Sequence, residues 1–188
     1  MKRSLLGRAG ALAVASLIVA VTVPASGHLA HQRDGNDPGP LDIRKASFNH
    51  REGVIKISQT SDESWAPPLL GVDDGGDNDS ALLFQFESRG NDYTDYVVLV
   101  DYIDGRLRAQ LRRWVPAGEQ TSDSEFVSRV KVKKVGRTVR VRFPMKSLQP
   151  RERHIGWSAQ SIFKDDGPCR PACKDFAPNS RYVYRHFL

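Results

Sequence analysis

The chain has 188 residues, and its 28 Lys and Arg against 22 Asp and Glu give a formal net charge of +6. This length fits one domain with a sizeable hydrophobic core. Residues 1–25 hold three of the cations and no acid, so the remainder carries 25 cations against 22 acids, a net charge of +3. So small an excess is not typical of a dedicated nucleic-acid binder, and we expect no specific nucleic-acid partner.

Residues 1–25 have the three-part pattern of a secretory signal peptide. Basic residues begin the segment, residues 11–23 are almost entirely apolar, and Val23-Pro24-Ala25 offers small residues for cleavage. The apolar stretch is shorter than the roughly 20 residues that a transmembrane helix needs. We therefore expect a cleaved signal, a secreted or cell-surface protein, and no membrane span in the mature chain. Cleavage after Gly27 or Ala30 remains an alternative.

Period-two alternation dominates the rest of the chain. Residues 26–40 are rich in His, Asp, Gly and Pro, which predicts a flexible lead-in. Residues 41–188 show no repeat and no internal boundary, so they predict a single domain. Short apolar-alternating runs separated by turn signals are typical of sandwiches and barrels. These runs lie at 43–48, 55–58, 82–87, 96–100, 107–111, 130–132, 139–143 and 155–163.

The predicted fold is an all-β, antiparallel, jelly-roll-like β-sandwich of about eight or nine strands. Asp104-Gly105 is a tight-hairpin signal between two of the runs. Residues 96–100 are apolar on both faces, which predicts a central, covered strand. Helical periodicity is nearly absent.

Cys169 and Cys173 are the two cysteines of the chain. In an exported protein, so close a pair predicts a disulfide. The spacing is not that of a Cys-x-x-Cys redox motif, and no second pair completes a zinc site. We expect the bond to pin an otherwise irregular C-terminal segment after Asp165.

The chain opens with a predicted hairpin, DIRKASFNHREGVIKIS, and continues with a run of three strands, ALLFQFESRGNDYTDYVVLVDYIDGRLRAQL. It closes with RTVRVRFPMKSL followed by GWSAQSIF. This order of features, over about residues 41–163, resembles the carbohydrate-binding and DOMON-type β-sandwiches of secreted proteins.

The resemblance implies noncovalent binding of sugars or, in one branch, of haem through axial Met and His ligands. Met145 is the only Met after the signal segment, and no His is placed to pair with it. The sugar branch is therefore favoured, with a glycan or cell-surface polymer as the partner. A structural or adhesive module that binds another protein is the alternative.

Catalytic patterns are missing from the sequence. None of the five His residues lies in a His-Glu-x-x-His motif, and Gly156-Trp157-Ser158-Ala159-Gln160 lacks the second Gly of a nucleophile elbow. We therefore expect a protein that is not an enzyme.

One acidic loop is a candidate metal site. Its carboxylates are separated by glycines, and hard oxygen ligands of this kind bind Ca²⁺. The spacing does not match an EF-hand, so a solvated Asp-Gly loop remains the alternative. The candidate ligands are Asp73, Asp74, Asp77 and Asp79.

A basic face is the candidate ligand site. Alternation along residues 106–114 directs one set of side chains away from the core, and this set is Arg106, Arg108, Arg112 and Trp114. Further cations are in the same phase at 129, 131 and 133 and at 140 and 142. If these strands are neighbours, they form one basic face for an anionic glycan, with the Trp114 indole stacking on a sugar. A solvated surface is the alternative.

Trp65 lies in the loop Ser64-Trp65-Ala66-Pro67-Pro68. Its ring either stacks on a ligand or plugs one end of the sandwich. Trp157, by contrast, falls on the apolar side of its run and is expected in the core.

Overall fold

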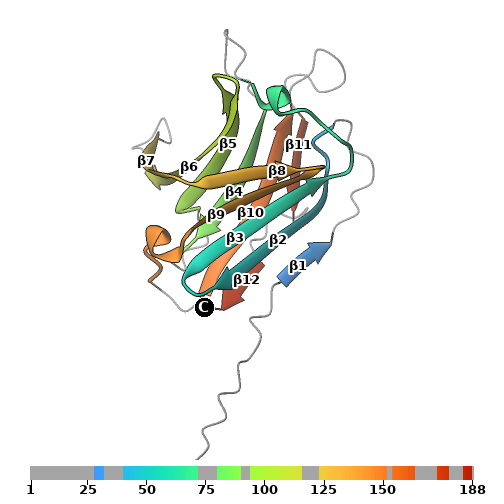
Figure 1. Ribbon diagram of the computed structural model, residues 1–188. Coiled ribbons are helices and arrows are strands. Elements are labelled where there is room, and N and C mark those ends of the chain that lie inside the picture. Colours follow the sequence, from blue (N-terminus) through green and yellow to red (C-terminus); the bar gives the residue numbers. More distant parts are fainter. Residues whose placement is uncertain are drawn as a thin grey trace, which may run out of the picture.

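The fold is an all-β sandwich of two antiparallel sheets (Figure 1). The computed structural model describes residues 28–31, 40–71, 80–89, 94–115, 123–151, 154–163, 173–177 and 184–187. These residues form twelve strands and two short 3-10 turns, η1 (Pro67–Leu70) and η2 (Met145–Leu148). The predicted fold class is confirmed. The predicted signal peptide lies outside the described residues.

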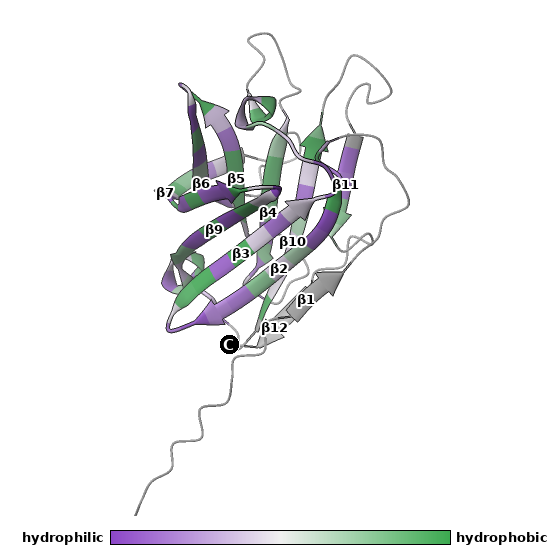
Figure 2. Cartoon of the chain, turned by 45° about the vertical axis from the view of Figure 1, so that its right-hand side comes forward, coloured by the Kyte–Doolittle hydropathy of each residue, from purple (hydrophilic) through white to green (hydrophobic). Residues whose placement is uncertain are grey.

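The smaller sheet has five strands in the order β1-β2-β3-β9-β8. Their bounds are β1 (His28–His31), β2 (Ile43–Arg51), β3 (Val54–Ser61), β9 (Thr138–Pro144) and β8 (Lys131–Val135). Hydrophobic and hydrophilic residues alternate along β3 and β9 (Figure 2).

The larger sheet has seven strands in the order β11-β10-β4-β5-β6-β7, and β12 also pairs with β10. Their bounds are β11 (Cys173–Ala177), β10 (His154–Phe163), β4 (Ala81–Glu87), β5 (Tyr96–Ile103), β6 (Arg106–Val115), β7 (Asp123–Arg129) and β12 (Tyr184–Phe187). The predicted hairpin between β5 and β6 is confirmed, since Asp104 and Gly105 have φ of 53° and 73°.

The chain changes sheets between β7 and β8. Only Val130 separates the two strands, and its N–H donates to the Ala109 carbonyl of β6 at 3.0 Å. β7 therefore ends the larger sheet, whereas β8 ends the smaller one. This corner decides which basic residues share a face.

The core fills the space between the sheets. Phe48 of the smaller sheet stacks on Trp157 of the larger one, with ring centroids 5.7 Å apart and an interplanar angle of 19°. Phe86 and Phe143 meet edge to face at 5.6 Å. Such pairs add to the stabilisation from burial alone. The expected core position of Trp157 is confirmed.

Three strands lie where irregular chain was expected. β1 falls within the predicted lead-in and pairs with β2, while β11 and β12 fall within the C-terminal segment and pair with β10. These predictions were wrong for the paired residues, because a short edge strand can be held by main-chain hydrogen bonds without alternating apolar side chains. Within the described part of the chain, no helix is long and apolar enough to cross a membrane.

Candidate ligand-binding groove

A groove of about 770 Å³ runs over the outer face of the larger sheet. Its size falls within the roughly 300–1,000 Å³ of typical small-ligand sites. The register of the sheet builds it, because side chains of neighbouring strands stand in rows. Gln160, Leu83 and Leu99 form one row across β10, β4 and β5. Gln85, Val97 and Arg112 form the next across β4, β5 and β6.

The floor of the groove is apolar. Leu83, Val97, Leu99 and Ile162 line it from β4, β5 and β10. These residues point away from the main core, since Leu82, Phe84, Val98 and Val100 occupy the inner positions of the same strands. An apolar surface on the outer face of a sheet is a candidate binding surface for a ligand.

A chain of neutral hydrogen-bonding groups crosses this floor. The Gln85 amide donates to the Gln160 Oε1 at 3.0 Å, and the Thr94 hydroxyl donates to the Gln85 Oε1 at 3.4 Å. These bonds fix the orientation of both amides on rigid strands. Each amide has two donor hydrogens and an acceptor oxygen, so capacity remains for a ligand rich in hydroxyl groups.

Arg112 forms the charged wall of the groove. Its Nε donates to the Ser124 hydroxyl and its Nη2 to the Ser124 carbonyl, both at 2.7 Å. The guanidinium thereby ties β6 to the edge strand β7 and is held in a fixed position. A guanidinium has five N–H donors, and a carboxylate or phosphate can accept two of them side by side.

Asp95 brings a buried carboxylate to the same end of the groove. Its Oδ2 accepts hydrogen bonds from the Ser88 N–H at 2.7 Å and the Ser88 hydroxyl at 3.1 Å. Arg89 lies 3.6 Å from the other carboxylate oxygen. The charge of Asp95 is therefore compensated within the protein. We assign Asp95 a structural role at this end of the groove and not a contact with the ligand.

Trp114 presents an aromatic ring at the groove. The side chain is 41% exposed, whereas Trp65 and Trp157 are 6% and 0% exposed. Its backbone N–H donates to the Asp95 carbonyl at 2.8 Å, which anchors the end of β6. An exposed indole next to a fixed guanidinium offers both a stacking surface and an ionic contact.

Of the four ligand-binding residues predicted on β6, two line the groove and two do not. Arg112 and Trp114 line the groove together, as their shared phase indicated. Arg106 and Arg108 do not line it, although they point to the same side of the sheet. Arg108 forms an ion pair with Asp104 at 2.5 Å in the β5–β6 hairpin, and it lies opposite Asp101.

Asp101 is a buried carboxyl near this hairpin. Burial raises its pKa above the ordinary value of 3.8, and the Arg108 charge acts in the opposite direction. Asp101 does not line the groove, so its ionisation is expected to affect the stability of the fold and not ligand binding.

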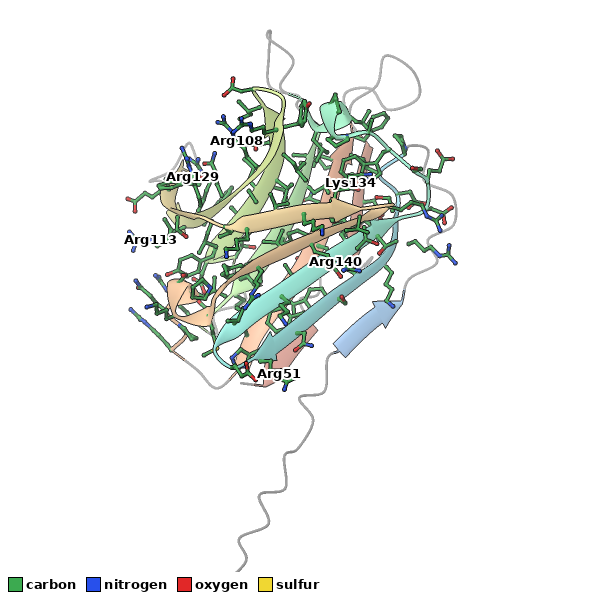
Figure 3. All side chains as sticks on the ribbon, viewed as in Figure 1. Arg51, Arg108, Arg113, Arg129, Lys134 and Arg140 are labelled. Atoms are coloured by element: carbon green, nitrogen blue, oxygen red, sulfur yellow. The ribbon has the colours of Figure 1, made fainter. Side chains whose placement is uncertain are left out.

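The hypothesis of one continuous basic face was wrong. Arg129 lies on β7 in the larger sheet, whereas Lys131 and Lys133 on β8 and Arg140 and Arg142 on β9 lie in the smaller sheet. The sheet change at Val130 separates them. Figure 3 shows Arg140 over the smaller sheet, away from Arg108 and Arg129 beside the larger one.

Trp65 plugs the sandwich and is not presented to a ligand. It belongs to the hydrophobic core, and its Nε1 donates to the Ser61 hydroxyl at 3.1 Å. The Lys134 ammonium lies 4.6 Å from the ring centroid. The predicted role of Trp65 as a ligand-stacking residue was therefore wrong, because burial removes the faces of its ring from solvent.

The remaining predicted sites fall outside what the structure describes. Asp73, Asp74, Asp77 and Asp79 belong to the segment 72–79, and Cys169 belongs to 164–172. Cys173 is described only through its backbone in β11. Among the described residues, no group of three or more His, Cys, Asp or Glu side chains could hold a metal ion.

The amide chain of the groove was not predicted from the sequence. Gln85 and Gln160 lie 75 positions apart and meet only because β4 pairs with β10. The available signal was their outward phase on strands whose inward-facing residues are mostly apolar. Period-two alternation shows that phase, but it does not show which strands are neighbours.

No protein-family model, curated protein or solved structure matches this chain. The groove itself therefore carries the functional argument.

Proposed function

We propose that this protein is a secreted, non-catalytic domain that binds a glycan in the groove of the larger sheet. One observation carries the proposal: an exposed Trp114 indole, a fixed amide chain and an apolar floor line a single groove of about 770 Å³. A sugar ring has an apolar face that stacks on an indole and a rim of hydroxyls that needs donors and acceptors. The lining supplies both kinds of contact.

Arg112 extends the proposal to glycans that carry a carboxylate, sulfate or phosphate. Its guanidinium is oriented by Ser124 before any ligand arrives. A charged donor that is already oriented loses little freedom on binding. The strands themselves are rigid supports, so the site requires no large rearrangement. The resemblance to secreted carbohydrate-binding sandwiches is part of this proposal.

The test is a glycan array probed with the purified protein and with two aromatic variants. Trp114→Ala removes the ring from the groove. Phe126→Ala is the matched control, because Phe126 is 56% exposed on the neighbouring strand β7 but does not line the groove. We expect Trp114→Ala to lose the signal and Phe126→Ala to keep it. Equal binding by both variants and the unmodified protein would contradict the proposal.

One observation favours a structural or adhesive module as the second candidate. The edge strand β7 exposes Phe126 and Val127 at 56% and 38%. An edge strand with exposed apolar side chains can pair with a strand of another protein. Under this alternative, Phe126→Ala abolishes attachment to the partner and Trp114→Ala does not, so the same two variants separate the candidates.

A further inference from the structure

A second groove lies on the outer face of the smaller sheet, and its chemistry differs from that of the first. It has a volume of about 360 Å³. Five exposed cations line it from three adjacent strands. We call this site the cationic groove. Its cations are Lys56 of β3, Arg140 and Arg142 of β9, and Lys131 and Lys133 of β8.

The strand register places these cations directly opposite one another. Arg142 lies between Lys56 and Lys131, so three cations cross three strands in one row. Arg140 lies opposite Lys133 in the next row. Neighbouring strands are only about 4.8 Å apart, and like charges that face each other across a sheet are destabilising.

The protein does not neutralise this charge with its described residues. None of the ion pairs among them includes a cation of this groove. The outward-facing positions of β2, β3, β8 and β9 hold no Asp or Glu. Glu52, in the turn between β2 and β3, pairs with Arg51 at 3.2 Å.

Neutral polar groups flank the cations on the other side of the groove. Ser47 and Asn49 of β2 and Ser58 of β3 line it, and the two serine hydroxyls are 2.7 Å apart. The lining contains no aromatic ring. The site therefore offers ionic contacts along one side and hydroxyl or amide contacts along the other.

We propose that the cationic groove is a second binding site, which takes a linear acidic polysaccharide bearing sulfate, phosphate or carboxylate groups. Such a polymer carries both the anions and the hydroxyls that the two sides of the groove would bind. A single-stranded nucleic acid fits less well, because its bases need aromatic rings for stacking. An anionic membrane also fits less well, because no large exposed apolar side chain lines the groove for insertion. The site lies on the face opposite Trp114 and does not depend on the glycan groove.

The test measures binding of heparin, as the acidic polysaccharide probe, to the purified protein and a double variant. Lys133→Glu with Arg142→Glu turns each of the facing cation pairs into a pair of opposite charges, so the variant should fold. We expect it to lose at least tenfold in heparin affinity. For the unmodified protein, five contacts at about 0.7 released counterions each predict a fall of about 100-fold between 50 and 200 mM salt.

The matched control is Arg106→Glu with Arg129→Glu. It makes the same change in net charge on exposed residues of the larger sheet. We expect this control to bind heparin within about twofold of the unmodified protein. Equal losses in the two double variants would overturn the proposal, since they would show attraction by net charge alone.

Two further probes test the class of ligand. A single-stranded oligonucleotide and vesicles of anionic phospholipid, compared at the same salt, should both bind more weakly than heparin. Tighter binding of either probe would overturn the assignment to a polysaccharide. Lys133 and Arg142 line only the cationic groove, so a loss of heparin affinity in their double variant can be told apart from failure of the glycan proposal for the first groove.

Discussion

Reversal of one charge, Arg142→Glu, should stabilise the folded protein. Arg142 is exposed and faces Lys56 on one side and Lys131 on the other. The substitution changes two repulsive cross-strand contacts into two attractive ones, and each such contact is worth roughly 0.2–1 kcal/mol. The free energy of unfolding should therefore rise by about 0.4–2 kcal/mol. For a domain of this size, that corresponds to an increase in Tm of roughly 1–8 °C.

Thermal unfolding followed by circular dichroism at low and high salt provides the assay. The gain should shrink in 1 M NaCl, where the Debye length falls to about 3 Å. Arg106→Glu is the control, because Arg106 faces Ile103 and not a cation. A lower Tm for Arg142→Glu, or a gain that salt does not change, would refute the argument that the facing cations repel each other.

Three other predictions concern stability and processing. Burial raises the pKa of Asp101, so as the pH rises its carboxyl group stays protonated longer in the folded protein than in the unfolded chain. The contribution of this group to the free energy of unfolding is therefore lost as pH rises through the folded pKa. Asp101→Asn should therefore gain stability relative to the unmodified protein as the pH rises above 3.8, and urea unfolding that shows no relative gain would exclude this effect. N-terminal sequencing of protein recovered from the medium should begin between residues 26 and 31, and an intact Met1 would rule out cleavage. Thiol titration of the unreduced protein should find Cys169 and Cys173 unreactive, whereas two free thiols would exclude the disulfide.

The strands were predictable because their physical signal is local. Leu82, Phe84 and Phe86 occupy every second position of β4, and all point into the core. The same alternation placed Arg112 and Trp114 on one side of β6, where they do line the groove. A period of two in the sequence is enough to assign a residue to one face of its own strand.

The order of strands was not predictable, and the errors follow from it. Whether Arg108 and Arg140 share a face depends on the sheet change at Val130, which no local pattern indicates. The burial of Trp65 likewise depends on the distant residues that surround it. The meeting of Gln85 with Gln160 required a strand pairing between segments far apart in the sequence.

The most direct test of the glycan groove uses the intrinsic fluorescence of the protein. Of its three Trp residues, Trp114 is 41% exposed, and the other two are at most 6% exposed. Acrylamide should therefore quench Trp114 selectively, and Trp114→Ala should remove the accessible fraction. At a saturating concentration of a glycan that scores on the array, we predict that quenching of Trp114 is largely lost. A glycan that binds at saturation and leaves Trp114 as accessible as before would contradict the proposed site.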